Sequence, residues 1–415
     1  MAAGNRRSTR ADDPPEDRPV RRRPADRRAQ IANVSAEAFG THGYHGVSME
    51  EIATRLDITS TALYRHYPSK YALFRQEALR LSGISAEAVR LPPESAEWDA
   101  ERRCEHVFEA LLAVSITNRR RGALLRWQHR YLEEDDRRIL IAQMAATDSA
   151  IRARIAELRP ALPGAERAVL TAAVMSVIGS ISDHRVAVPT RPLTALLAGA
   201  CRDIAGCALP AVTGAEERTP PPPAATFTHE VVLQKAVELF HVRGYPAVSV
   251  EDIAAAAGLP ASSAVYRFYR SKGDLLAAAF RRAADRVSAA IGPAIAGTEG
   301  PGAALTELIE LYVAGSFAER ELTFVYYAEI GNVPAADRTT LRNIQRLNVE
   351  EWAKLVTAVR SGLSAAQARV LVHAALALVV DLGQWMGPDH PECTRARVVH
   401  LMRVILLGSA AEGQG

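Results

Sequence analysis

The sequence lacks the features that mark several large classes of protein. Its 415 residues carry a formal net charge of only +3, which is too small to indicate a nucleic-acid partner by itself. Its four cysteines (Cys104, Cys201, Cys207, Cys393) form no CxxC pair and no zinc pattern, which favours reduced thiols in a cytosol. We find no signal-peptide pattern and no apolar run that we judge long enough to span a bilayer. We therefore expect a cytoplasmic protein with no membrane partner.

Patterns of catalysis are missing as well. The sequence contains no Gly-rich phosphate loop, no HExxH and no GxSxG. The stretch DHPEC (389–393) gathers four side chains of metal-ligating types, but no partner ligands recur elsewhere in the sequence. We expect no enzymatic activity, no cofactor and no metal site.

The residues that are present favour a helical protein. Hydrophobic residues make up 48% of the chain, Ala and Leu dominate, and runs of β-branched residues are scarce. The most apolar stretch, VLVHAALALVVDLGQWM (370–386), carries His373 and Asp381 and predicts a buried helix. The predicted fold class is all-α, and the length is sufficient for two to four domains.

The sequence contains an internal repeat that covers nearly the whole of each half. Three pairs of segments align, the first and third at an offset of 201 residues and the second at 202: 36–53 with 237–254, 64–74 with 266–276, and 159–170 with 360–371. Between the halves lies PAVTGAEERTPPPPAAT (210–226), whose proline run predicts an extended, semi-stiff linker. The chain is therefore a tandem duplication of one helical unit.

Each half begins with a short cluster of predicted helices. The first helix covers about residues 27–42 and ends at Gly43, which suits a C-terminal cap. Ser48 begins a second helix with a Ser-x-x-Glu capping box, and Ser249 with Asp252 gives a weaker version in the second half. A third helix runs from about Thr59 to His66, before Pro68 and the cap of a fourth helix at Ser69. Two short helices joined by a tight turn and braced on either side predict a helix-turn-helix head.

The predicted domains follow from the repeat and from these heads. Residues 6–28 hold nine arginines against five acids and almost no large apolar side chains, which predicts a disordered basic arm that could follow DNA phosphates or simply add solubility. The predicted domains are a basic arm (1–26), a first helix-turn-helix domain (27–82), a first regulatory and dimerisation domain (95–209), a linker (210–226), a second helix-turn-helix domain (227–284) and a second regulatory and dimerisation domain (300–409).

The third predicted helix combines hydroxyl, aromatic and basic side chains. Ala62, Leu63 and Tyr67 fall on a face that suits packing, which leaves the other face to point outward. The outward residues are Thr59, Ser60, Thr61, Arg65 and His66. Small hydroxyl residues allow a helix to approach the floor of the DNA major groove, and neighbouring cations hold the phosphates. This combination favours a helix that reads DNA.

The ordered set of residues resembles the helix-turn-helix pattern of the TetR/AcrR family of bacterial transcriptional regulators. The residues that carry the resemblance are Phe39, Gly43-Tyr44, Ser48-Met49-Glu50-Glu51-Ile52-Ala53, Leu63-Tyr64-Arg65-His66-Tyr67-Pro68-Ser69-Lys70 and Leu73. Asp57 replaces the turn glycine of the family, and Asp tolerates a positive φ better than most residues do. The resemblance covers 31–75 and, less completely, 228–276.

The resemblance implies an all-helical bacterial protein of the nucleoid, with double-stranded operator DNA and a small-molecule effector of unknown identity as partners. It implies a repressor that the effector releases from DNA. The base-reading positions would be Ser60 and Thr61, and the phosphate positions would be Ser48, Thr59, Tyr64, Arg65 and Lys70. The alternative is a ligand-binding or interaction protein that keeps the fold with reduced or lost DNA binding.

The second head departs further from the pattern. Gly258 to Tyr266 is one residue longer than Asp57 to Tyr64, so the turn or the recognition helix holds an insertion. An insertion inside the helix would rotate the preceding residues by about 100° away from the groove, whereas Pro260 at the first helical position would leave the extra residue in the turn. The candidate contacts of this head are Ser249, Ser262, Ser263, Tyr266, Arg267 and Lys272. The alternative is a degenerate head, whose helices are retained as structure only.

Two further expectations concern the rest of each half. Aromatic and ionisable residues on amphipathic helices are candidates for an effector pocket, or else packed core residues: Trp127, Arg130, Tyr131, Tyr326, Tyr327, Glu329, Arg346 and Trp352. The last two helices of each half, about 165–186 with 191–208 and 365–386 with 395–409, are rich in Ala, Leu and Val. We expect the two halves to pair through these helices as an intramolecular pseudo-dimer, or else two chains to form a homodimer.

Overall fold

The structure of the protein, a computed structural model, describes residues 24–212, 227–385 and 390–408. All regular elements in these ranges are helices, as the composition predicts. The arm before residue 24, most of the predicted linker and Asp389 of the DHPEC stretch lie outside the described residues.

The first half contains nine α-helices and three short 3-10 helices among its described residues. In chain order they are α1 (Pro24–His42), α2 (Met49–Arg55), α3 (Ser60–His66), α4 (Lys70–Ala88), η1 (Pro93–Glu97), α5 (Ala100–Thr117), α6 (Gly122–Trp127), η2 (His129–Tyr131), α7 (Glu134–Leu158), α8 (Gly164–Gly179), η3 (Ser180–Ser182) and α9 (Thr190–Gly206). The first helix begins three residues earlier than predicted, so residues 24–26 belong to α1 and not to the arm.

The second half repeats this order. Its elements are α10 (Thr228–Arg243), η4 (Tyr245–Ala247), α11 (Val250–Ala256), η5 (Ser262–Arg267), α12 (Lys272–Ala296), α13 (Pro301–Ala318), α14 (Arg320–Glu329), η6 (Ile330–Asn332), α15 (Ala335–Val359), α16 (Ala365–Trp385) and α17 (Arg395–Leu407). α7 and α15 both have 25 residues and start 201 residues apart, and α5 and α13 both have 18 residues at the same offset. The two halves are therefore two copies of one helical unit.

The predicted helix caps need one correction. Ser48 accepts a hydrogen bond from the backbone N–H of Glu51, but the Glu51 carboxylate pairs with Arg55 at 2.7 Å and does not complete the box. The complete capping box is the second one, where the Asp252 carboxylate accepts from the Ser249 backbone N–H at 2.8 Å. The Asp252 carboxylate completes the box while it also pairs with Arg243 at 3.3 Å.

The turn before α3 has the conformation that the family pattern requires. Asp57 has φ = 53° and is the one non-glycine residue with positive φ in the described chain. Gly258 stands at the same place in the second half with φ = 69°. A short polar side chain replaces glycine here at little cost, because aspartate can visit the left-handed region.

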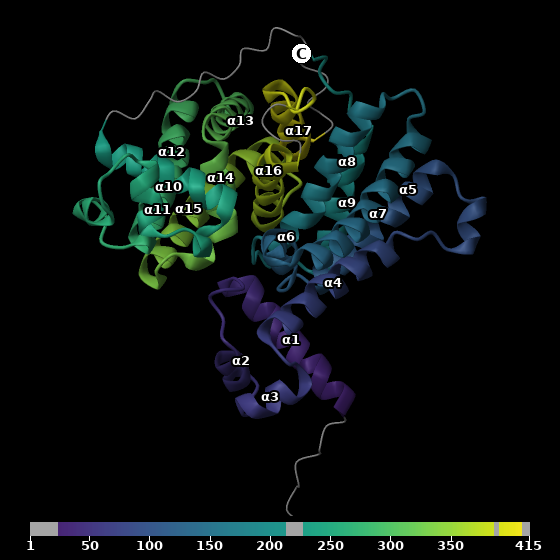
Figure 1. Ribbon diagram of the computed structural model, residues 1–415. Helices are drawn as coiled ribbons and strands as arrows, with labels where there is room; N and C mark the ends of the chain where they lie inside the picture. The colour runs from purple at the N-terminus through teal and green to yellow at the C-terminus, as the bar shows by residue number, and fades with distance from the viewer. Residues whose placement is uncertain (1–23, 213–226, 386–389, 409–415) are drawn as a thin grey trace, which may run out of the picture.

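The two halves pack together through the last helices of each. α8 contacts α16, and α9 contacts α17, so that four helices form one bundle at the centre of the molecule (Figure 1). The largest hydrophobic core draws residues from both sides, for example Val174 and Val177 from α8 with Leu371 and Leu378 from α16. In the described structure, the last two helices of each half therefore pair the two halves of one chain, as the pseudo-dimer hypothesis expects.

We expected no apolar run long enough to span a bilayer, and this expectation was wrong for two helices if only their length and composition are considered. The helical segments Gly164–Ser182 and Ala365–Trp385 are both long and apolar enough to do so. The most apolar windows of these segments are 61% and 72% buried inside the protein. The second segment is the buried helix that the stretch 370–386 predicts, and both are core helices of the bundle.

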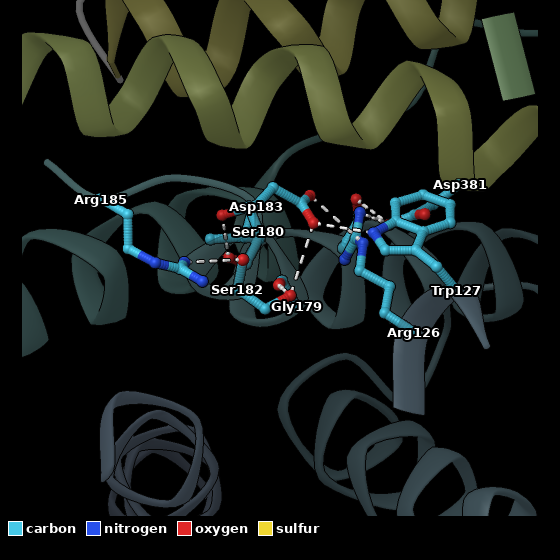
Figure 2. Close-up of polar contacts among 10 residues, drawn as sticks. Arg126, Trp127, Gly179, Ser180, Ser182, Asp183, Arg185 and Asp381 are labelled. Atoms are coloured by element: carbon cyan, nitrogen blue, oxygen red, sulfur yellow. Dashed lines mark hydrogen bonds and ion pairs between the residues drawn. The ribbon is translucent and has the colours of Figure 1, made fainter. Parts of the chain in front are cut away.

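A buried polar network crosses this bundle (Figure 2). The Arg126 guanidinium of α6 donates to Asp381 Oδ2 of α16 at 2.6 Å, and its Nε lies 3.3 Å from Asp183 Oδ2. Ser176 of α8 also donates to Asp381 Oδ2, and the Trp127 indole N–H donates to Asp183. Burial raises the pKa of both carboxyl groups, and the neighbouring Arg126 opposes that rise.

The network is present on one side of the pseudo-symmetric junction only. The residues 201 positions away are Tyr327 for Arg126, Ser180 for Asp381 and Gln384 for Asp183. None of these three residues can reproduce the ion pair on the other side. Pairing two first halves would leave each Arg126 with Asp183 alone, and pairing two second halves would leave each buried Asp381 without Arg126. A buried charge without its partner is strongly destabilising, so the network selects pairing between unlike halves.

We predict that Asp381→Asn lowers the free energy of unfolding by about 3 kcal/mol, because Arg126 then keeps only Asp183 in a buried environment. Urea denaturation followed by circular dichroism measures this change. The matched control is Asp148→Asn in the exposed Arg152–Asp148 pair, which should change stability by less than about 0.5 kcal/mol. Equal losses in the two variants would contradict the structural role of the network.

Two histidines stack across the same junction. The rings of His184, which follows η3, and His373 of α16 lie 4.5 Å apart and 9° from parallel. Burial, together with nearby Arg119 and Arg369, lowers the pKa of His373 to about 4, and burial lowers that of His184 further. Both rings are therefore neutral in the folded protein at neutral pH.

We predict that the wild type loses about 2 kcal/mol more stability than His373→Phe between pH 7 and pH 4.5. The unfolded chain binds a proton at His373 from about pH 6.5 downward, whereas the folded chain resists it until about pH 4, so stability falls with pH in that window. The raised pKa of Asp381 acts in the opposite sense, and the comparison with the variant removes that contribution. Parallel stability curves for the two proteins would show that His373 is not the responsible group.

Candidate nucleic-acid interface

The first head projects from the body of the molecule at the lower edge of Figure 1. α2 packs on both α1 and α3, and Ile52, Leu63 and Tyr67 of this head are all nearly inaccessible. Thr59 caps α3 by accepting from the Ala62 backbone N–H at 3.2 Å. The inward face of α3 is thus fixed by the core, as the sequence predicts for Tyr67.

The opposite face of α3 is open to solvent. Thr61 and Arg65 are exposed, and Tyr64 is 46% exposed. Ser60 and His66 at the two ends of the helix are half-buried. Hydroxyl, phenol and guanidinium groups therefore share one accessible surface of a helix that is held at its back. A surface of this kind can enter the major groove and present donors and acceptors to base edges.

Lys70 has a different position from the one expected. Its ammonium donates to the backbone carbonyls of Tyr44 and Val47, both at 3.1 Å, and lies 4.4 Å from the centre of the Tyr44 ring. Lys272 repeats the arrangement, with carbonyls of Tyr245 and Val248 at 2.9 and 2.7 Å. Two of the three ammonium N–H groups are thereby used inside the protein. Both lysines therefore have a structural role at the corner, and their phosphate contacts stay a prediction.

Each head joins its body through the corner that these lysines brace. In the first half, the Tyr44 backbone N–H donates to the Gln128 side chain at 2.9 Å. In the second half, the Tyr245 backbone N–H donates to the Glu329 carboxylate at 3.1 Å. Gln128 and Glu329 are equivalent, 201 residues apart. One repeat thus uses a neutral amide where the other uses a buried carboxylate.

The second head has a different recognition segment. Residues Ser262–Arg267 form the 3-10 helix η5, whereas the equivalent α3 is an α-helix. Pro260 lies before the helix, so the inserted residue sits in the turn. A 3-10 helix has three residues per turn, and so Tyr266 and Arg267, though exposed, project in a different pattern from Tyr64 and Arg65. Ser262 is half-buried, and Ser263 is exposed.

The predicted effector residues separate into three groups. Tyr326, Tyr327 and Trp352 line a cavity of about 70 Å³ in the second half, and Trp127 and Arg130 line one of about 350 Å³ at the junction. Tyr131 and Glu329 meet in a contact between the halves, where the Tyr131 hydroxyl donates to Glu329 at 3.3 Å. Arg346 is largely exposed, pairs with Glu350 and lines a groove of about 720 Å³ between the halves, which Trp127, Tyr326 and Tyr327 also line.

Most residues of the junction cavity were missed by sequence reasoning, among them Arg126, Met144 and Met175. Arg126 could have been found from the sequence, because it is a charged residue within the apolar run of residues 123–127. The two methionines carried no signal, because apolar residues on a helix indicate a core and do not show where that core leaves a space. Among the described residues there is no group of three or more metal-ligating side chains.

Comparison with known proteins places both heads in one family. The profile described as bacterial regulatory proteins of the tetR family matches residues 31–76 and 232–279. These two matches cover α1 to α4 and α10 to α12, in the two copies of the repeat. The chain thus carries two tandem helix-turn-helix heads of the TetR family.

Individual relatives match one part of this chain. The HTH-type transcriptional activator FasR of Mycolicibacterium smegmatis is 29% identical over 150 residues, which are 36% of this chain and 63% of FasR, less than two thirds of its length. A TetR-family regulator from Bordetella parapertussis 12822 is 17% identical and covers 45% of this chain and 98% of its own, with a TM-score of 0.40. PfmR of Thermus thermophilus is 24% identical, and the match covers 43% of this chain and 98% of PfmR, with a TM-score of 0.38.

We predict that Lys70→Met lowers the free energy of unfolding by about 1–2 kcal/mol even without DNA, because two hydrogen bonds and a cation–π contact at the corner are lost. Thermal and urea unfolding of the DNA-free protein measure the loss. Lys272→Met should behave alike. A stable Lys70→Met variant that has only weaker DNA binding would support the phosphate assignment.

Proposed function

We propose that the chain is a transcription regulator that binds double-stranded operator DNA through its first head, under the control of a small molecule bound in the helical body. The observation that carries this proposal is the two-sided character of α3. Leu63 and Tyr67 fix the inner side in the core, while Thr61, Tyr64 and Arg65 remain accessible on the outer side. The match of both heads to the TetR family supports the same conclusion.

In this proposal the second head does not read base edges. η5 lacks the α-helical geometry that would place consecutive turns along a groove, and Lys272 is occupied at the corner. Its remaining candidate contacts, Ser249, Ser262, Ser263, Tyr266 and Arg267, offer at most phosphate contacts. One chain would then bind an asymmetric site, with a single set of base contacts from α3.

The direction of regulation depends on where the operator lies in a promoter. The resemblance implies repression, whereas the relative FasR is described as an activator. Repressor release by an effector therefore stays a prediction. A footprint on the DNA that the protein selects from a random pool would map the operator and show whether its protected bases are symmetric.

We predict distinct effects for two substitutions on α3. Thr61→Ala should cost about 1–3 kcal/mol on the preferred operator and relax the preference at one base pair, because a base contact is lost. Tyr64→Ala should weaken binding to all sequences by a similar factor, because phosphate contacts carry no base information. Fluorescence anisotropy with the selected operator and single-base variants measures both effects.

The matched control is Tyr266→Ala, at the equivalent position of the second head, which should leave operator affinity within about twofold. If neither of the two substitutions on α3 changes affinity, the first head is not the reading head. No selective, salt-sensitive binding to any DNA would favour the alternative of an interaction protein with the same fold.

A further inference from the structure

The two halves contain cavities at equivalent positions but of very different size. The cavity in the first half has a volume of about 350 Å³, and the one in the second half about 70 Å³. Residues 201 or 202 positions apart line them: Leu125 and Tyr326, Arg126 and Tyr327, Met144 and Gln345, Met175 and Leu376, Ser85 and Val287. Duplication thus gave two copies of one cavity, which have since diverged.

Aromatic side chains account for the difference in volume. Tyr326 and Tyr327 stand where the first half has Leu125 and Arg126, and Trp352 closes the second cavity from α15. An engineered cavity of about 150 Å³ is known to admit benzene, so the second cavity is too small for one ring while the first admits a larger molecule. The first cavity is therefore the candidate site for a small molecule.

The first cavity is not confined to the first half. Its wall includes Phe324 of α14 and His241 and Val242 at the end of α10, in the second head. Val242 is 80% exposed and Trp385 of α16 is 44% exposed, so two large apolar side chains lie in solvent at the rim. A molecule in this cavity would touch α4, which leads to the first head, and α10 of the second head.

The charges at the cavity are already compensated. Arg126 pairs with Asp381 at 2.6 Å and with Asp183 at 3.3 Å, and Arg130 pairs with Glu329 at 3.3 Å. His129 and His241 also belong to the wall, and burial lowers the pKa of each, which keeps both neutral. An additional anion would therefore be buried without a free cation, at a high cost in free energy.

One donor group in the wall remains available for a neutral acceptor. Arg130 Nη2 is buried and has no hydrogen-bond partner among the described residues. A carbonyl oxygen can accept from such a donor without adding charge. The apolar part of the wall includes Met144 and Met175, whose flexible side chains adapt to the shape of a ligand.

We infer that the first cavity binds a neutral, mostly apolar molecule with a hydrogen-bond acceptor such as a ketone or ester oxygen, and that this molecule bridges α4 of the first head and α10 of the second. Any effect of this molecule on DNA binding rests on the proposed function, whereas the binding of the molecule to the cavity does not. Binding to the DNA-free chain can therefore fail or succeed independently of operator recognition.

A pair of fluorescent naphthalene probes tests the ligand class on the full-length protein. Prodan is neutral and carries a ketone, and 1-anilinonaphthalene-8-sulfonate carries a sulfonate anion. We expect Prodan to bind one molecule per chain at least tenfold more tightly than the anionic probe. Tighter binding of the anion, two Prodan molecules per chain, or no Prodan binding would overturn the inference.

Substitutions taken from the other repeat locate the site. Leu125→Tyr copies Tyr326 into the first cavity and should weaken Prodan binding at least tenfold with an unchanged far-UV spectrum. Met144→Phe fills the same cavity from α7 and serves if Leu125→Tyr does not fold. Tyr326→Leu, the converse change in the second half, should leave the Prodan affinity within twofold. Equal Prodan affinity in the wild type and a folded filling variant would place the probe elsewhere.

Removing one compensating charge tests the electrostatic argument. Glu329→Gln copies the equivalent Gln128, keeps an acceptor for the Tyr245 backbone N–H and leaves the charge of Arg130 unpaired. We expect the sulfonate probe to bind about tenfold more tightly to this variant, with Prodan changed by less than twofold. If the sulfonate affinity does not rise, the charge of Arg130 does not face the cavity. Hydrogen exchange should show Prodan protecting the end of α10 around His241, and no protection there would contradict the bridge.

Discussion

The structure depends on one buried ion pair between halves that are otherwise copies of each other. Arg126 of the first half and Asp381 of the second meet inside a bundle built almost entirely from apolar side chains. Apolar packing between α8 and α16 would serve any pairing of such halves, because it is non-directional. The Arg126–Asp381 ion pair forms only when a first half packs against a second half. It therefore favours the junction between the two halves over the pairing of two identical halves.

Divergence of the two copies follows a consistent pattern around that junction. The first half keeps an open cavity and an α-helical recognition segment, and the second half fills its cavity with Tyr326 and Tyr327 and shortens its recognition segment to a 3-10 helix. Once both copies are held in one chain, they no longer need identical sites. One copy can keep the contact surface while the other provides support.

The sequence predicted the architecture well because repeats, caps and helix breakers are local signals. The helix-turn-helix head, Asp57 in the turn, the buried Tyr67 and the pairing of the last helices all appear in the structure. The sites were harder to predict, because they depend on distances across the junction. No local pattern shows that Lys70 turns back onto the carbonyls of Tyr44 and Val47, or that Arg126 finds a carboxylate 255 residues away.

The same junction holds the two heads differently. Gly331 packs against the backbone of His42 at the first corner, and its equivalent in the first half is Arg130, which forms an ion pair with Glu329 at the second corner. Tyr131 stands between the corners, with its ring 4.7 Å from that of His45 and its hydroxyl on Glu329. The second corner is thus anchored by the buried Glu329 carboxylate, which accepts from Tyr245 and Tyr131 and pairs with Arg130. At the first corner the Tyr44 backbone N–H has the neutral Gln128 side chain as its acceptor. Hydrogen bonds to a charged group are stronger than those to a neutral amide, so the divergence of Gln128 and Glu329 gives the second corner the stronger anchor.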